Sequence, residues 1–259
     1  MLAGGFLGAV AGPNLASATR DALPVPFAGA YAALVGVALL ALLTVSFIDF
    51  PPLPLPSAAR PGRPLREIAR QPVFIVAVLA CALGYGVMNL LMAATPIAMA
   101  QCSHPFSNTA LVLEWHVLGM FVPSFFTGSL IKRFGCLPVM AVGVALNAVC
   151  IAIALSGVEL MQFVIALLTL GVGWNFLFIG GTTLFTQAYR PEEKTSAQAA
   201  MDTVIFTTMT LASFSSGALV TIRGWTLLNL GSIVPVLLAT AALSWFALQR
   251  RAAQHRASA

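Results

Sequence analysis

Long apolar runs that carry almost no charge are the feature that most constrains what this chain can fold into. The runs cover about residues 2–18, 27–49, 73–98, 109–131, 137–157, 160–188, 197–221 and 226–248, with polar or proline-rich breaks between them. An α-helix rises about 1.5 Å per residue, so roughly 20 apolar residues cross a bilayer core about 30 Å thick. The sequence therefore predicts an integral membrane protein with about eight transmembrane helices and no large soluble domain.

Residue usage favours helices over a membrane β-barrel. The chain contains 21 Gly and 16 Pro, which suits apolar helices that pack closely and bend. A barrel would instead show alternating strands of about ten residues. Cys81, Cys102, Cys136 and Cys150 form no CxxC pair and have no partner at metal-ligand spacing, so neither a disulfide framework nor a metal site is expected. The predicted fold class is all-α, a polytopic α-helical membrane protein.

The distribution of basic residues predicts how the helices are oriented. If Met1 is cytoplasmic, eleven Lys and Arg residues lie inside and only Arg20 and Arg223 lie outside, as the positive-inside rule requires. The inside residues are Arg60, Arg63, Arg66, Arg70, Lys132, Arg133, Arg190, Lys194, Arg250, Arg251 and Arg256. Membrane topology therefore explains the net charge of +5, and no nucleic-acid partner is expected. Both termini are predicted to be cytoplasmic.

A proline- and arginine-rich segment divides the chain. Residues 50–72 contain seven prolines and four arginines, too many for a transmembrane helix or for one long helix of any kind. The stretch 65–70 follows Pro64 and has helical spacing of charge, which predicts a short surface helix. The expected parts are two transmembrane helices over 1–49, a cytoplasmic linker over 50–72, a six-helix bundle over 73–248 and a basic cytoplasmic tail over 249–259.

The segment Gly-Ser-Leu-Ile-Lys-Arg-Phe-Gly at 128–135 resembles the GxLaDRxG loop signature of the major facilitator superfamily, a family of membrane transporters. We expect Gly128 to let two helices approach at a tight turn and Gly135 to accommodate the reversal of the chain. The basic pair Lys132 and Arg133 is expected to hold this loop at the cytoplasmic face. Lys132 stands where the signature has an acidic residue, which points to a second-half copy and argues against a gating role.

Glycines recur every four residues in the first run, at Gly4, Gly8 and Gly12, followed by Pro13. The segment resembles the GxxxGP core of a motif in the superfamily's fifth helix that is associated with proton-coupled antiporters, although Ala16-Ser17 replaces its closing glycine pair. The same spacing by itself predicts a smooth face for close helix packing. Both interpretations, packing and antiporter motif, stay open at this point.

The resemblance also covers residues 85–99 and 114–120, which are similar to bacterial members of the superfamily. It implies that the first two runs are the family's fifth and sixth helices, that the linker is its central loop and that the other six runs are its second half. The first four helices of the family's twelve are then absent. The implied protein is a multi-pass secondary transporter of the bacterial inner membrane that moves a small solute by alternating access, with proton-coupled efflux as one form.

The partners that this implies are membrane lipid, a small-molecule substrate and, for a coupled transporter, H⁺. No cofactor is expected. The sequence contains no GxSxG, HExxH or P-loop motif, so enzyme activity and nucleotide-driven pumping are not expected either.

Asn89, Trp174 and Asn175 are the candidate residues of a substrate cavity. In the superfamily the seventh and tenth helices, here the runs 73–98 and 160–188, line the central pathway, and these side chains fall near mid-membrane. Trp usually lies at the membrane interface, so a Trp at mid-depth needs a hydrogen-bond partner or an aromatic pocket. Hydrogen bonding between helices is the competing explanation for the two amides.

Three ionisable side chains within the apolar runs are candidates for a proton or gate function, because a buried charge in a membrane is costly. Two interpretations of Glu114 stay open. It is a protonation or substrate-contact site near the outer mouth, or it is a carboxylate that reaches water at the membrane interface. His116 lies roughly 200° further round the helix, so the two do not form one cluster; it is a packing residue or a proton relay. Asp202 is a gate contact, or pairs with Lys194, Lys132 or Arg133.

A second function stays open: a truncated, transport-incompetent fragment with at most a binding or scaffolding role. With the four first helices missing, one wall of the cavity is open, and its polar faces meet lipid or another copy of the chain. Unsatisfied amides in hydrocarbon favour association by about 0.6–2 kcal/mol per hydrogen bond recovered. We therefore expect the chain as given to self-associate through the open face and not to transport solute alone.

Overall fold

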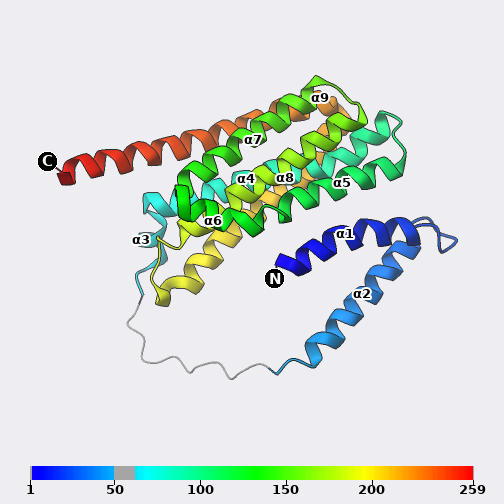
Figure 1. Ribbon diagram of the computed structural model, residues 1–259, viewed down its shortest axis with the longest axis horizontal. Coiled ribbons are helices and arrows are strands. Elements are labelled where there is room, and N and C mark those ends of the chain that lie inside the picture. The colour runs from blue at the N-terminus through cyan, green and yellow to red at the C-terminus, as the bar shows by residue number, and fades with distance from the viewer. Residues whose placement is uncertain (1, 50–61, 259) are drawn as a thin grey trace.

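The computed structural model describes residues 2–49 and 62–258, and every regular element in these ranges is a helix (Figure 1). The α-helices are α1 (Leu2–Thr19), α2 (Ala28–Ser46), α3 (Leu65–Ala69), α4 (Pro72–Gln101), α5 (Phe106–Phe121), α6 (Ser124–Phe134), α7 (Cys136–Ser156), α8 (Leu160–Phe185) and α9 (Lys194–Ser258). A short 3₁₀ helix, η1 (Pro191–Glu193), precedes α9. The predicted all-α class is confirmed.

Six segments of the described chain are long and apolar enough to cross a membrane: 28–46, 72–101, 106–134, 136–156, 160–185 and 191–254. The last is much longer than one crossing, and its backbone leaves the helical region at Gly224, with φ 78° and ψ 173°. Figure 1 shows α9 doubling back on itself, so this one segment contains the two predicted runs 197–221 and 226–248. The first predicted run is α1, and all eight predicted runs are therefore helical.

Local sequence explains where several helices begin. Pro72 is the first residue of α4, a position where its missing N–H costs nothing. Glu159 and Gln162 form a capping box at the start of α8, in which Gln162 Oε1 accepts the backbone N–H of Glu159 at 2.8 Å. The short helix α3 follows Pro64, as expected.

The predicted run 109–131 is not one helix. α5 ends at Phe121 and α6 begins at Ser124, because Pro123 has no N–H to donate to the helix. α6 then continues to Phe134, so most of the predicted loop signature is helical. A Cβ added at Gly128 would have no atom within 4 Å. The prediction that two helices approach closely at this residue is therefore wrong. Gly135 does make the chain reversal, with φ 87°.

Glycines bring α8 into backbone contact with two of its neighbours, α5 and α7. A Cβ at Gly119 would lie 2.6 Å from the carbonyl oxygen of Leu168, and one at Gly171 would collide with the carbonyl oxygen of His116, so α5 and α8 touch. On the other side, a Cβ at Gly143 of α7 would lie 2.8 Å from the carbonyl oxygen of Gly173. Small residues at helix contacts are the usual means of packing in membranes. These glycines let α8 pack closely between α5 and α7.

α1 and α2 contribute little to this bundle. α1 packs against α5 and α2, whereas only 6% of α2 is buried. The expected close contact at Gly8 and Gly12 is not observed, because a Cβ at either residue would meet no atom within 4 Å. These two glycines instead line a cavity of about 470 Å³ between α1 and α2. The side-chain surroundings of Gly4 lie outside the described residues, and Pro13 lies within α1.

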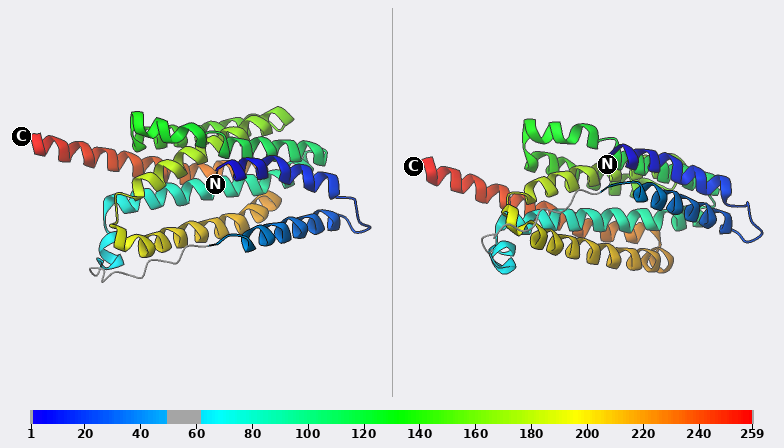
Figure 2. Two further views of the ribbon diagram at one scale, coloured as in Figure 1. Left: turned by 60° about the horizontal axis from the view of Figure 1, so that its bottom comes forward. Right: turned by 90° about the horizontal axis from the view of Figure 1, so that it is seen from below.

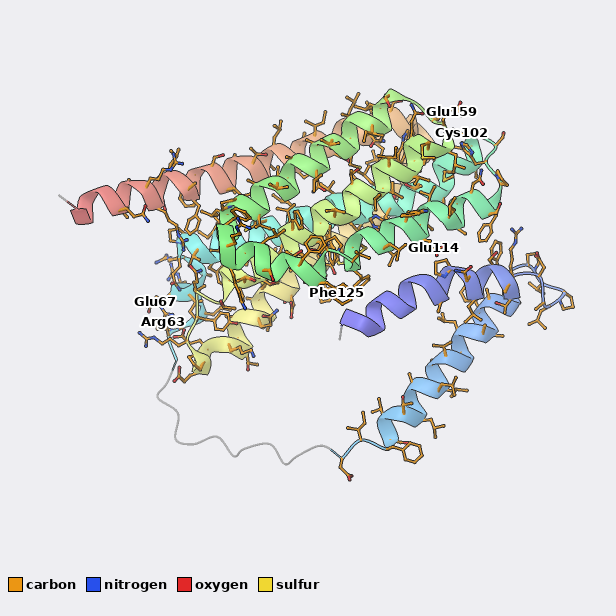
Figure 3. All side chains as sticks on the ribbon, in the orientation of Figure 1. Arg63, Glu67, Cys102, Glu114, Phe125 and Glu159 are labelled. Carbon is orange, nitrogen blue, oxygen red and sulfur yellow. The ribbon has the colours of Figure 1, made fainter. Side chains whose placement is uncertain are left out.

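The two ends of the bundle differ in the chain segments that they hold. Arg63 and Glu67 lie at one end, whereas Cys102 and Glu159 lie at the other (Figure 3). The first end also holds α3 and the loop between α8 and η1. The last turns of α9 extend beyond this end as a continuous helix (Figure 2), so the described part of the predicted tail 249–259 is helical.

Candidate functional site

Aromatic and amide side chains meet where α4 packs against α8. Tyr85 and Asn89 lie one turn apart on α4, and Trp174 and Phe178 lie one turn apart on α8. Tyr85, Asn89 and Phe178 are half-buried, whereas Trp174 is 6% exposed. Because residues at i and i+4 share a helix face, Tyr85 and Asn89 lie on one face of α4, and Trp174 and Phe178 lie on one face of α8. Together these faces carry three aromatic rings and one amide.

The three rings form a right-angled group. Trp174 stacks on Phe178 with ring centroids 5.1 Å apart and an interplanar angle of 9°. Tyr85 stands perpendicular to both, at 5.0 Å and 83° from Trp174 and at 5.3 Å and 89° from Phe178. Both arrangements are favourable for aromatic quadrupoles. The indole Nε1 of Trp174 is buried and has no hydrogen-bond partner.

Sequence reasoning identified Trp174 and Asn89 but missed Tyr85 and Phe178. The signal that could have found them is the spacing of four residues, from Tyr85 to Asn89 and from Trp174 to Phe178. Asn89 Nδ2 donates to the carbonyl oxygen of Met209 at 3.0 Å and so joins α4 to α9. Its Oδ1 accepts no hydrogen bond from the described residues.

Asn175 does not share the face of Trp174. The side chain is 1% exposed, and its Nδ2 donates to the carbonyl oxygen of Met120 and to Ser124 Oγ, both at 2.6 Å. Its Oδ1 accepts a hydrogen bond from the Thr127 hydroxyl at 2.7 Å. All of these partners lie on either side of the α5–α6 break. Asn175 therefore bonds α8 to that break and acts as a packing residue in this structure.

The two ionisable residues of α5 have different surroundings. His116 is fully buried between α5 and α8, and its Nδ1 lies 2.8 Å from the carbonyl oxygen of Leu167. Its Nε2 has no partner. Glu114 is half-buried on α5 (Figure 3) and makes no hydrogen bond or ion pair with the described residues. The contact to Leu167 supports a packing function for His116, and it does not connect His116 with Glu114.

Asp202 is half-buried on α9 and accepts a hydrogen bond from Gln198 Nε2 at 2.9 Å, one turn earlier in the same helix. The ion pairs found in the described residues are Arg20–Asp21 and Arg63–Glu193. The expected pairing of Asp202 with a neighbouring Lys or Arg is therefore not observed.

An ion pair that the sequence did not reveal ties the linker to the loop before α9. Arg63 Nε and Nη2 donate to the two carboxylate oxygens of Glu193 at 2.8 Å each, and the Arg63 backbone N–H donates at 2.9 Å. The Arg190 backbone N–H also donates to Glu193, at 2.9 Å. Glu193 is 2% exposed, and hydrogen bonding to it raises the pKa of the Arg63 guanidinium. Gln71 Nε2 adds a bond to the Ala188 carbonyl oxygen at 2.8 Å.

The helices, with six segments long and apolar enough to cross a membrane in the described residues, define a polytopic α-helical membrane protein. Residues 83–259 match the family model of the Major Facilitator Superfamily, and the chain belongs to that superfamily.

Two curated relatives agree with this assignment, and one solved structure has a similar fold. The chain is 42% identical over 232 residues to the "Riboflavin transporter RfnT" of Brucella anthropi, covering 88% of this chain and 58% of the relative. It is 28% identical to the "Uncharacterized MFS-type transporter YddS" of Bacillus subtilis, over 93% of this chain and 59% of the relative. A bacterial homologue of the iron transporter ferroportin, in an outward-facing state, matches in fold with a TM-score of 0.58 at 19% identity, over 92% of this chain and 60% of that one. The chain thus spans less than two thirds of the length of each.

Proposed function

We propose that this chain forms one wall of the solute pathway of a secondary transporter that moves a small solute by alternating access. The observation that carries the proposal is the half-buried face of Tyr85, Asn89 and Phe178 on α4 and α8. These helices correspond to the runs that, by the family resemblance, line the central pathway. In an apolar bundle, aromatic and amide side chains at mid-helix supply the few polar and stacking contacts that orient a solute.

We propose riboflavin as the first solute to test, because one relative with 42% identity is named a riboflavin transporter. For coupling to protons we propose Glu114, a half-buried carboxylate of α5 that has no partner among the described residues.

The test has two measurements on the 259-residue chain. Riboflavin binding to the detergent-solubilised chain tests the pathway wall, and riboflavin flux into sealed vesicles under an imposed pH gradient tests transport. Saturable binding supports the proposal, and its absence contradicts riboflavin as the solute. Flux above that of empty vesicles supports transport by these residues, and loss of its pH dependence in Glu114→Gln supports coupling at that residue.

A second candidate is a binding or scaffolding protein that does not transport by itself. The observation that favours it is that 6% of α2 is buried and that the cavity beside it is open to the surroundings of the bundle. Riboflavin binding without flux would support this candidate, and it is the result expected if alternating access needs helices beyond the described ones.

We also propose that the end of the bundle that holds Arg63 faces the cytoplasm of a bacterial cell. The excess of basic residues at this end supports the orientation. An impermeant thiol reagent applied to intact cells should then modify Cys102, which is exposed at the opposite end, and spare Cys136 at the start of α7. Modification of Cys136 with an unmodified Cys102 would invert the topology.

A further inference from the structure

Trp174 and Trp225 are both buried, but only one of them is satisfied. Trp225 is 8% exposed, and its Nε1 donates to the carbonyl oxygen of Ala154 at 3.0 Å. Trp174 is 6% exposed, and its Nε1 has no partner. A buried donor without an acceptor costs roughly 1–3 kcal/mol, and buried indole N–H groups usually find a partner. The unpaired N–H is therefore a candidate donor to an acceptor from outside the described residues.

Two of the rings beside this donor are partly exposed. Tyr85 and Phe178 are half-buried and stand at 89° to each other, so they form a right-angled corner with Trp174 stacked behind Phe178. A flat ligand that stacks on one of these rings meets the other edge-on. Offset stacking and edge-to-face contact are the two arrangements that aromatic rings prefer. The corner thus suits a planar ring better than a flexible chain.

Asn89 supplies the complementary polar group. It lies one turn from Tyr85, its Nδ2 is held by the Met209 carbonyl oxygen, and its Oδ1 accepts nothing from the described residues. A half-buried residue with an unused acceptor and a Trp with an unpaired donor together match a ring whose edge carries both an N–H and a C=O group. Heteroaromatic imides and lactams carry a C=O and an N–H group on the edge of a flat ring. Saturated sugars and alkyl chains have no flat ring face.

We propose that Tyr85, Trp174 and Phe178 form a stacking site for a planar heteroaromatic ring, and that Trp174 Nε1 donates a hydrogen bond to an acceptor on the edge of that ring. This rests on the proposed function, because it names the chemical class of solute that the pathway wall takes. The site holds the ring, and a polar substituent such as the ribityl chain of riboflavin extends away from it.

The test is a set of titrations on the solubilised 259-residue chain with three probes: riboflavin, lumichrome, which is the flavin-type ring without the side chain, and ribitol, which is the side chain without the ring. Tyr and Trp side chains close to a flavin quench its fluorescence, so contact with Tyr85 and Trp174 lets binding be read directly. Lumichrome should bind with quenching, and ribitol should not compete. Competition by ribitol, or riboflavin binding with no lumichrome binding, would overturn the site.

Three variants locate the ring. Trp174→Phe keeps an aromatic ring but removes the N–H and should weaken riboflavin binding about tenfold. Phe178→Leu removes the stacking ring and should weaken it by about tenfold or more. Trp225→Phe is the matched control: it removes a satisfied indole away from the site, so it should lower the melting temperature and leave the affinity unchanged.

The outcomes separate this inference from the proposed function. If the wild type binds riboflavin and the folded Trp174→Phe and Phe178→Leu variants bind it equally well, the site is wrong and riboflavin remains a candidate solute. If the wild type binds neither riboflavin nor lumichrome, the stacking site and riboflavin are both excluded. Flux of a different solute would then still support a transporter.

Discussion

Replacing Asn175 by Leu distinguishes a packing residue from a cavity residue. In the structure the amide takes part in three hydrogen bonds, with the Met120 carbonyl, Ser124 Oγ and Thr127 Oγ1. Hydrogen bonds between helices in a membrane contribute about 0.6 kcal/mol on average and up to about 1.7 kcal/mol each. Three average bonds give about 2 kcal/mol. For a chain of this size that free energy corresponds to a fall in melting temperature of about 4–8 °C.

A thiol-reactive fluorogenic probe can follow the unfolding, because Cys81 and Cys150 are 1% and 0% exposed and react only when the bundle opens. The exposed Cys102 and the half-buried Cys136 are replaced by Ser to remove their background signal. Asn89→Leu is the matched control, since Asn89 donates one interhelical hydrogen bond rather than sharing three. Its melting temperature should fall by about 1–2 °C.

The reasoning would be refuted by the opposite pattern. If Asn175→Leu melts at the wild-type temperature but no longer binds riboflavin, then Asn175 faces solute and the hydrogen bonds to the α5–α6 break do not stabilise the bundle. Equal shifts for both variants would show that the number of interhelical bonds does not set the stability.

Two further predictions use matched pairs of residues. Glu193→Gln weakens the ion pair with Arg63, so trypsin should cut the linker after Arg66 or Arg70 faster than in the wild type. Glu192→Gln changes an exposed neighbour in the same η1 turn and should leave the rate unchanged. Equal rates for the two variants would show that the ion pair does not hold the linker. Gly171→Ala places a methyl group against the α5 backbone and should destabilise the bundle by about 1–3 kcal/mol. Gly128→Ala meets no atom within 4 Å and should be neutral or stabilising by about 0.5–1 kcal/mol, which thermal melts of both variants would check.

The helices themselves could be predicted from the sequence because each apolar run satisfies its own backbone hydrogen bonds. In a bilayer no other arrangement of such a run is stable, so hydropathy and length are enough to find the eight helical segments. The turns at Gly135 and the short helix after Pro64 follow from equally local causes, a backbone with positive φ and a proline at a helix start. The break before α6 was missed, although Pro123 was visible in the sequence, because a proline inside an apolar run bends some helices and ends others.

The partners of each side chain were decided only by the tertiary structure. Trp174 and Asn175 are adjacent in the sequence and both suggested a cavity, but consecutive residues of a helix point about 100° apart. One side chain meets the Tyr85 ring of α4 and the other meets the α5–α6 break. Likewise Arg63 and Glu193 are 130 residues apart, and no local pattern links them. Local sequence specifies where a helix lies along the chain, whereas the rotation and packing of helices specify which faces meet, because those depend on contacts between distant segments.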